Sequence, residues 1–461
     1  MIRADRPRTP RDLMPAIDRL FELSASKILA LERGSSAGGA PVFTVEGRYT
    51  ARGWTEWTQG FQYGSALLQY DATGDAAFLE LGRARTLSDM ASHLTHTGVH
   101  DHGFNNVSTY GALWRLGREG RIQAEPWEMH FYELALKISG AVQARRWTRL
   151  PSGGFIHSFN GAHSLFVDTI RSLRALALAH LLGHRLSEEQ DAEVNLLERL
   201  LQHAHATAHY SVYYGRDRDA YDVRGRVSHE ALFNVANGTY RGPSSQQGFS
   251  PFTTWTRGLA WAMLGFAELI EFLDDARDPL PGGEDRTTVD AWMIEAARAT
   301  CDFYIDHAAC ADGIPYWDTG APGLVALGDW ATRDADPFNS HEPVDSSAAA
   351  IAAQGLMRLG HVLARRGEDG ERYLQSGLRV LATLFDATGP YLSQAPDHQG
   401  LILHSIYHRP NGWDFVPKGS RIPRGESSQW GDYHAREAAL YVKRLASAGP
   451  YLTFFGPHGR D

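Results

Sequence analysis

The segment VHDHGFNN places one carboxylate, Asp101, between two imidazoles, His100 and His102, with His93 and His96 a few residues upstream. Three kinds of site use these groups. Imidazole and carboxylate both bind zinc, a carboxyl group beside an imidazole can transfer protons, and Asp101 could simply cap a helix. No CxxC or HExxH motif accompanies the histidines. The sequence therefore favours proton transfer, and we expect neither a metal nor a cofactor.

A second carboxylate, Asp168, stands at the start of the apolar segment SLFVDTIRSLRAL. It could cap the helix that follows and complement the helix dipole. Alternatively, the helix begins at the wall of a cleft. Phe166, Val167 and Ile170 would then desolvate the carboxyl group, raise its pKa and let it keep a proton near neutrality.

The segment SQQGFSPFTTWTRGLAW is rich in groups that suit sugar binding. Arg257 offers a planar fork for a carboxylate, while Trp255 and Trp261 offer flat faces that stack on sugar rings. Gln247 precedes them, and His229 lies upstream in HEALFNVANG. Taken singly, Trp261 is better explained as a core residue and Arg257 as one half of a surface ion pair.

Composition excludes several classes of protein. The 461 residues carry a net charge of −9, which argues against a nucleic-acid partner. No stretch approaches the roughly 20 apolar residues of a membrane span, and the N-terminus lacks the apolar run of a secretion signal. Cys301 and Cys310 are too few for a disulfide framework. We therefore expect a cytoplasmic protein.

Helical periodicity dominates the chain. Thr9 and Pro10 predict the start of a first helix, which carries one apolar stripe. Ser187 and Gln190 form the pattern of a capping box, and Gly183 is placed to end the preceding helix. The stripe of the first helix comprises Leu13, Ile17, Leu20, Phe21 and Ile28.

The helices are joined by alternately short and long loops, with no change of composition that would mark a domain boundary. A ring of antiparallel helix pairs explains this pattern, because each helix can bury one stripe inward and another against a neighbour. Long loops at one end of the ring would build the site.

Seven motifs occur in the order found in the unsaturated glucuronyl hydrolases, glycoside hydrolase family 88, which the chain resembles from about residue 54 to residue 445. They are EWTQGF, HDHGF, VDTIRSL, QQGFSPFTTWTRGLAW, IPYWD, DSSAAAIAA and WGDYHAREAAL. The resemblance implies an all-α fold, an (α/α)6 barrel of six helix hairpins. We expect residues 1–461 to form it as a single catalytic domain.

The resemblance also implies an activity. Polysaccharide lyases leave oligosaccharides that end in a 4,5-unsaturated uronic acid. Enzymes of this family hydrate the C4–C5 double bond, and the hemiketal that results opens and releases the remaining sugar. The implied partner is such an oligosaccharide, with no nucleic acid and no membrane; a homodimer is compatible with the sequence. Alternatives are an unsaturated rhamnogalacturonyl hydrolase, an inverting glycosidase or sugar epimerase on the same barrel, and a non-catalytic sugar-binding protein.

Carried over by motif, the resemblance makes Asp168 the general acid and base, and makes Asp101 its assistant, with His100 beside it. The residues implied to bind substrate are Trp57, His100, His229, Gln247, Trp255, Arg257 and Trp261. The chain departs from the family at His102 and Leu259, and residues 209–228 look like an insertion that weakens the assignment of His229. These departures leave the two aspartates in place but bear on which leaving sugar is accepted.

Overall fold

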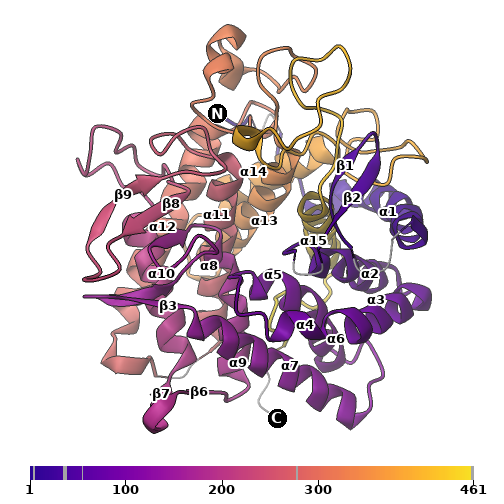
Figure 1. The fold of residues 1–461 in the computed structure, drawn as a ribbon. Coiled ribbons are helices and arrows are strands. Elements are labelled where there is room, and N and C mark those ends of the chain that lie inside the picture. Colours follow the sequence, from indigo (N-terminus) through magenta and orange to yellow (C-terminus); the bar gives the residue numbers. More distant parts are fainter. Residues whose placement is uncertain (4–5, 35–38, 54–55, 277–278, 458–461) are drawn as a thin grey trace.

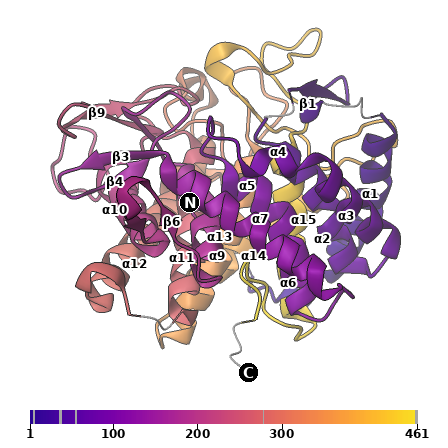
Figure 2. The same ribbon diagram turned by 60° about the horizontal axis from the view of Figure 1, so that its bottom comes forward.

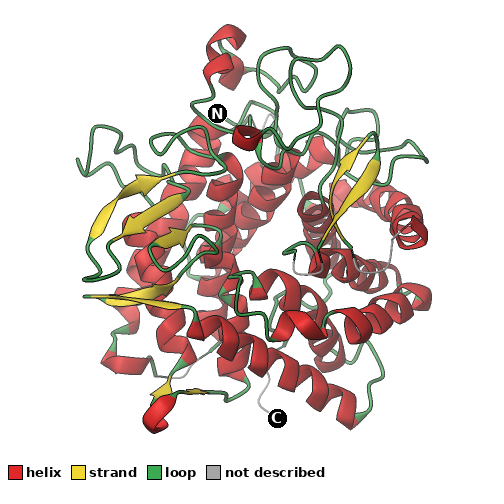
Figure 3. Cartoon of the chain, in the orientation of Figure 1, coloured by secondary structure: helices red, strands yellow, loops and turns green. Residues whose placement is uncertain are grey.

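The computed structural model describes residues 1–3, 6–34, 39–53, 56–276 and 279–457. Residues 54 and 55, where the family resemblance begins, lie outside this set. Helices predominate in the described part, and the strands are few and short (Figure 3). No helix in the described part is long and apolar enough to cross a membrane.

Six helical segments of the described chain form a closed inner ring, in which each segment contacts the next and the last contacts the first (Figure 1). They are buried on nearly all faces, as expected of helices surrounded by protein. The inner segments are α2 (Gln59–Thr73), α5 (His102–Asn106) continuing through the π-turn Val107–Gly111 into α6 (Ala112–Arg118), α8 (Thr169–Ser172) with α9 (Arg174–Leu181), α11 (Thr256–Asp275), α13 (Ser346–Arg365) and α15 (Gln429–Ala446).

An outer layer of helices, each apolar on its inward side, packs around this ring. Figure 1 shows α1, α3 and α7 at its periphery. The outer helices are α1 (Met14–Gly34), α3 (Ala76–Asp89) with α4 (Ala91–Leu94), α7 (Pro126–Arg145), α10 (Leu196–Tyr210), α12 (Arg286–Phe303) and α14 (Glu371–Leu384). Inner and outer helices alternate along the chain and pack as antiparallel pairs. The predicted (α/α)6 barrel is confirmed.

Strands decorate the long loops rather than the core. The hairpins are β1 (Ala40–Val45) with β2 (Arg48–Arg52), β3 (Trp147–Leu150) with β4 (Gly153–Ile156), and β6 (Leu186–Ser187) with β7 (Glu193–Val194). A three-stranded antiparallel sheet has the order β5 (Ser164–Phe166), β8 (Glu230–Phe233) and β9 (Tyr240–Ser244). Short 3-10 or π turns cover Pro10–Leu13, Glu189–Asp191, Pro281–Gly283, Tyr304–Ala308, Pro322–Leu327, Trp330–Thr332 and Arg409–Asn411.

The connections differ at the two ends of the ring. The longest segments lead from an outer helix into an inner one, except before α5, where residues 95–101 form a short connection. The connections from an inner helix to the next outer helix are shorter than these long segments. The N-terminal ends of the inner helices therefore lie at the end of the ring that carries the long segments. Figure 2 shows β1, β9 and the yellow segment that precedes α15 together on the upper side.

Two sequence-based expectations about helix ends meet different outcomes. Thr9 does cap the first turn at Pro10, and the stripe that follows is buried. The capping box at Ser187 and Gln190 is wrong, because Ser187 lies in β6. The cap of α10 is instead Asn195, whose side chain accepts from two backbone N–H groups of the first turn.

A buried ion network fills the ring between the inner helices. Arg171 of α8 donates to both oxygens of Glu268 on α11, at 3.0 Å each, and to Glu437 on α15 at 2.6 Å. Arg174 lies 3.8–3.9 Å from the same two glutamates. All four side chains are buried. Buried charges are costly unless they are paired, because water does not solvate them. Here two arginines pair with two glutamates.

Glu268→Gln should destabilise the protein strongly, because it leaves Arg171 with one carboxylate fewer in the interior. Breaking such a buried pair typically costs about 3–5 kcal/mol. The measurement is the free energy of unfolding from a denaturant titration. Glu193→Gln is the matched control, since Glu193 pairs with Arg185 at the exposed surface, where a pair contributes less than about 1 kcal/mol. Equal losses in the two variants would contradict the prediction.

Candidate active site

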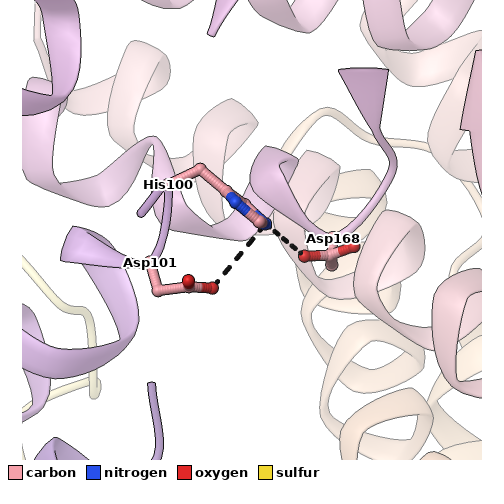
Figure 4. Close-up of side chains that lie close together, drawn as sticks. All are labelled: His100, Asp101 and Asp168. Carbon is pink, nitrogen blue, oxygen red and sulfur yellow. Dashed lines mark hydrogen bonds and ion pairs between the residues drawn. The ribbon is translucent and has the colours of Figure 1, made fainter. Parts of the chain in front are cut away.

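Asp101 and Asp168 converge on one imidazole (Figure 4). Nε2 of His100 lies 3.1 Å from Oδ2 of Asp168 and 3.7 Å from Oδ1 of Asp101. All three residues are more than nine-tenths buried. Residues separated by almost 70 positions in the chain thus form one cluster with two carboxylates and a shared imidazole.

Neither carboxylate serves as a helix cap. Asp101 and Asp168 occupy the N-cap positions of α5 and α8, but neither side chain bonds to a backbone N–H of its helix. Asp345, by contrast, accepts from the backbone of Ser347 and Ala348 at the start of α13. The capping interpretation is therefore wrong for Asp101 and Asp168, and their oxygens are available for chemistry.

The approach of α5 to α8 brings the two carboxylates together. Gly103 donates its N–H to Oγ of Ser172 at 2.9 Å, and a Cβ added at Gly103 would lie 2.2 Å from the Ser172 carbonyl oxygen. On the other side of α8, a Cβ at Gly265 of α11 would lie 3.0 Å from the backbone nitrogen of Arg171. These contacts leave no room for a side chain, which explains the glycine of the HDHGF motif.

Polar and aromatic neighbours hold the His100 ring in place. The carbonyl of His100 accepts from Oγ of Ser172 at 2.7 Å and from Nε2 of Gln143 at 3.0 Å. Phe166 packs edge-on against the imidazole, and Phe159 lies nearly parallel to it. The imidazole is thus fixed both through its backbone and by its surroundings.

The expected raised pKa of Asp168 is wrong. Burial does raise it, but the hydrogen bond and the charge of His100, with a smaller contribution from His229, outweigh burial and leave the pKa of Asp168 below its ordinary value. Burial raises the pKa of Asp101, aided by the charge of Asp168 and opposed by that of His100. Burial lowers the pKa of His100, but the two aspartates more than compensate and raise it.

His229 lies behind Asp168. Its Nδ1 accepts from the backbone N–H groups of Gln246 and Gln247, so the proton of a neutral ring must be on Nε2. That nitrogen lies 3.9 Å from Oδ1 of Asp168. Burial lowers the pKa of His229 to about 4. The neutral ring therefore directs its Nε2–H toward the carboxylate of Asp168.

Residues 209–228, which look like an insertion in the sequence, lie directly before His229. Val212 and Val227 pair as an antiparallel bridge, and Ser228 donates its N–H to the carbonyl of Ser211 at 2.9 Å. These pairings hold the two ends of the intervening segment side by side. Strand β8 therefore keeps its register beside β5, which ends at Phe166 just before Asp168.

A cavity of about 390 Å³ opens above the cluster. Of the predicted site residues, it is lined by Trp57, His100, Asp101, Asp168, Gln247, Trp255, Arg257 and Trp261. His229 is not among the lining residues. Trp57, Asp101, Asp168 and Trp255 each stand one or two positions before an inner helix, so the cavity lies at the N-terminal ends of the ring.

Part of the cavity wall was not predicted from the sequence. Tyr407, His408, Asn411 and Trp413 line the cavity from the loop before α15. The only sequence signal for them is the polar and aromatic run HSIYHRPNGW within a long loop. The further lining residues are Glu56, Val99, Phe104, Phe159, Phe166 and Gln246.

The guanidinium of Arg257 is not a free fork. It donates to the carbonyl oxygens of Ile406 and Tyr407 and to Oε1 of Gln247. Its plane lies between the rings of Trp255 and Trp430, with centroids 4.6 and 4.7 Å away. Arg257 therefore positions the loop and Gln247, and the expectation that its fork awaits a ligand carboxylate does not match this geometry.

The neighbouring histidines His93 and His102 bond to residues outside the cluster, and the described residues place only His100, Asp101 and Asp168 together as possible metal ligands. His102 bonds to the carbonyl of His96 and to Ser139, and His93 bonds to Gln59. A metal site built from His93, His96 and His100 is therefore not formed. The absence of a metal from the activity stays a prediction.

The chain is similar to unsaturated glucuronyl hydrolases. It is 25% identical over 407 residues to the unsaturated glucuronyl hydrolase of Bacillus sp. strain GL1, covering 86% of this chain and 89% of that protein. It is 24% identical over 409 residues to the unsaturated chondroitin disaccharide hydrolase of Streptococcus pyogenes serotype M1, covering 86% and 84%. No family model matches the chain.

Solved structures show the same fold. The crystal structure of the Bacillus sp. GL1 enzyme superposes with a TM-score of 0.70 at 21% identity, covering 93% of this chain and 96% of that one. An unsaturated glucuronyl hydrolase specific for heparin superposes with a TM-score of 0.71 at 18% identity, covering 94% and 98%. The ring of helix pairs is common to all three proteins.

Arg257→Lys should loosen the loop that precedes α15 without unfolding the barrel. An ammonium cannot reach all three acceptors that the guanidinium holds, and a hydrogen bond from a charged donor stabilises by about 1.5–3 kcal/mol. Amide hydrogen exchange in residues 406–414 should therefore accelerate at least about tenfold. Exchange within α13 serves as the internal control. Unchanged exchange in the loop would show that Arg257 does not hold it.

Proposed function

We propose that this protein is an unsaturated glucuronyl hydrolase, which releases a 4,5-unsaturated uronic acid from lyase-generated oligosaccharides by hydrating the C4–C5 double bond. The observation that carries the proposal is the convergence of Asp101 and Asp168 on His100 beneath a cavity walled by tryptophans. The names of the relatives support it, since the similarity spans more than four-fifths of both chains.

In this proposal Asp168 and His100 exchange the proton that the reaction needs. The 3.1 Å contact between Nε2 and Oδ2 lets a proton pass from the imidazole to the carboxylate. Asp168 delivers it to C4, and the oxocarbenium-like centre that forms at C5 takes up a water molecule. Asp168 then accepts the proton that this water loses. The hemiketal opens, and C1 releases the leaving sugar.

Asp101 has a separate part in the proposal. Its Oδ1 lies 3.7 Å from Nε2 of His100, and the residue lines the cavity. There it can bind the sugar and stabilise positive charge as the oxocarbenium-like centre develops. Trp57, Trp255 and Trp261 supply flat faces for the ring, and Gln247 is held beside them by Arg257.

An anionic substrate needs local attraction, since the chain as a whole carries a net charge of −9. With the Arg257 fork engaged by the protein, the helix ends are the better source. The N-terminal ends of α2, α5, α8 and α11 lie at the cavity, and each helix dipole places partial positive charge at that end. We therefore assign the attraction of the uronic carboxylate to these ends together with His100.

The geometry weighs against an inverting glycosidase. Inverting enzymes hold their two carboxyl groups about 6.5–9.5 Å apart to admit a water between them and the sugar. Here one oxygen of Asp101 and one of Asp168 lie within 4.8 Å of each other. The rhamnogalacturonyl hydrolase alternative, the single-domain organisation of residues 1–461, the homodimer and the cytoplasmic location stay predictions.

Asp168→Asn should lower turnover by about 10²–10⁴, because an amide can neither give nor accept the proton. The assay follows the loss of the ultraviolet absorbance of the conjugated double bond in unsaturated disaccharides. Asp75→Asn is the matched control: Asp75 caps α3 at the surface, and asparagine caps a helix equally well. Near-normal turnover of the Asp168 variant would remove its role. If the wild type instead cleaves saturated glycosides and leaves the double bond intact, hydration is the wrong reaction.

Gly103→Ala should reduce turnover at least about 100-fold, because the added methyl group separates α5 from α8 and shifts Asp101 relative to Asp168 by a fraction of an ångström or more. The overpacking should cost about 1–3 kcal/mol of stability. Gly389→Ala is the control, since a Cβ there meets its nearest atom at 3.4 Å. Turnover that falls only in proportion to the unfolded fraction would show that the helix contact does not set the geometry.

A further inference from the structure

The three side chains at the base of the cavity share a second capability. We propose that His100, Asp101 and Asp168 bind one divalent transition-metal ion, of the Zn²⁺ class, and that this ion blocks the site reversibly. The binding part of this inference does not rest on the proposed function, while the blocking part does.

The spacing of the donor atoms matches such an ion. Nε2 of His100 lies 3.1 Å from Oδ2 of Asp168 and 3.7 Å from Oδ1 of Asp101. One ligand atom from each of the three residues can be chosen so that all lie within 4.8 Å of one another. Zinc holds nitrogen and oxygen ligands at about 2.0–2.1 Å in a tetrahedron, which places neighbouring donors about 3.3 Å apart. The two distances from the imidazole nitrogen to the carboxylate oxygens, 3.1 and 3.7 Å, lie on either side of this value. Small adjustments of the side chains therefore suffice to surround an ion.

The donors also have unused capacity. Oδ1 of Asp168 is buried without a hydrogen-bond partner in the described part of the chain, and Nε2 of His229 is 3.9 Å away from it. The carboxylate of Asp101 makes no hydrogen bond to the side chain of any described residue, and its Oδ1 lies 3.7 Å from Nε2 of His100. Buried oxygens that lack partners are costly unless something binds them. An ion at this point would satisfy both carboxylates.

The donor set selects a class of metal. One imidazole and two carboxylates suit Zn²⁺, Co²⁺, Ni²⁺ or Cu²⁺, whereas Mg²⁺ and Ca²⁺ require six or more oxygen ligands. Three protein ligands leave further positions open toward the cavity for water. In tight metal sites the outer ring nitrogen of the histidine is hydrogen-bonded, but Nδ1 of His100 has no partner among the described residues. We therefore expect a reversible ion rather than a resident one.

Such an ion would compete directly with the reaction. It occupies Nε2 of His100 and Oδ2 of Asp168, between which the proposed proton transfer takes place. A bound ion also fills the lower part of the cavity that these residues line. Metal binding would therefore suppress turnover without altering the fold.

The test uses the full chain, freed of metal by a chelator and then titrated with Co²⁺. Its visible absorption reports nitrogen and oxygen ligands, and calorimetry gives the stoichiometry. We expect one Co²⁺ per chain, displaced by Zn²⁺, and a melting temperature that Zn²⁺ raises. His100→Gln and Asp101→Asn should each weaken Co²⁺ binding at least about tenfold. His130→Gln is the matched control, since His130 is an exposed histidine on α7 and its loss should change nothing.

Several outcomes would overturn the inference. One is a wild type that shows no saturable Co²⁺ absorption; others are variants of His100 and Asp101 that bind within tenfold of the wild type, or loss of binding in the His130 variant. In the activity arm, the chelated enzyme should keep its turnover and Zn²⁺ should suppress it. Bound Zn²⁺ with undiminished turnover would defeat the blocking role alone. An enzyme inactive on every unsaturated disaccharide would count against the proposed function and leave the binding result intact.

Discussion

The close approach of α5 and α8 is the constraint on which the site depends. Gly103 lies against the backbone of Ser172, and Gly265 presses on the other side of the same short helix. Because the ring is closed, helix spacing fixes where each inner helix begins. Asp101 and Asp168 stand at those beginnings, so a contact between backbones sets the distance between carboxylates. Backbone contacts tolerate almost no expansion, since protein interiors are close-packed.

Much of the fold could be predicted because its signals are local or repeated along the chain. Apolar periodicity marks the helices, and alternating loop lengths indicate paired helices around a ring. The helix ends were less predictable, since tertiary contacts decide them. Ser187 and Gln190 have the spacing of a capping box, yet this segment pairs as the β6–β7 hairpin and leaves the cap to Asn195. A local preference for a helix cap is overridden where the same residues can pair as strands.

The site was predictable in its membership and less so in its electrostatics. Motifs pointed to Asp101, Asp168 and the tryptophans, and all of them line one cavity. The partners of Arg257 could not be foreseen, because two of its acceptors are backbone carbonyls about 150 positions away. The pKa of Asp168 was expected to rise on burial alone. It falls because His100, from the segment before α5, donates to the same carboxylate.

The buried ion network and the cluster of His100, Asp101 and Asp168 differ in their balance of charge. Arg171 and Arg174 balance Glu268 and Glu437 where no ligand arrives, so that level of the ring carries no net charge and needs no solvent. The cluster above it has two carboxylates and one imidazole, and is therefore short of one cation. A growing positive charge on a bound sugar, or a metal ion, supplies that cation. The same deficit that suits a cationic transition state thus makes the site vulnerable to metals.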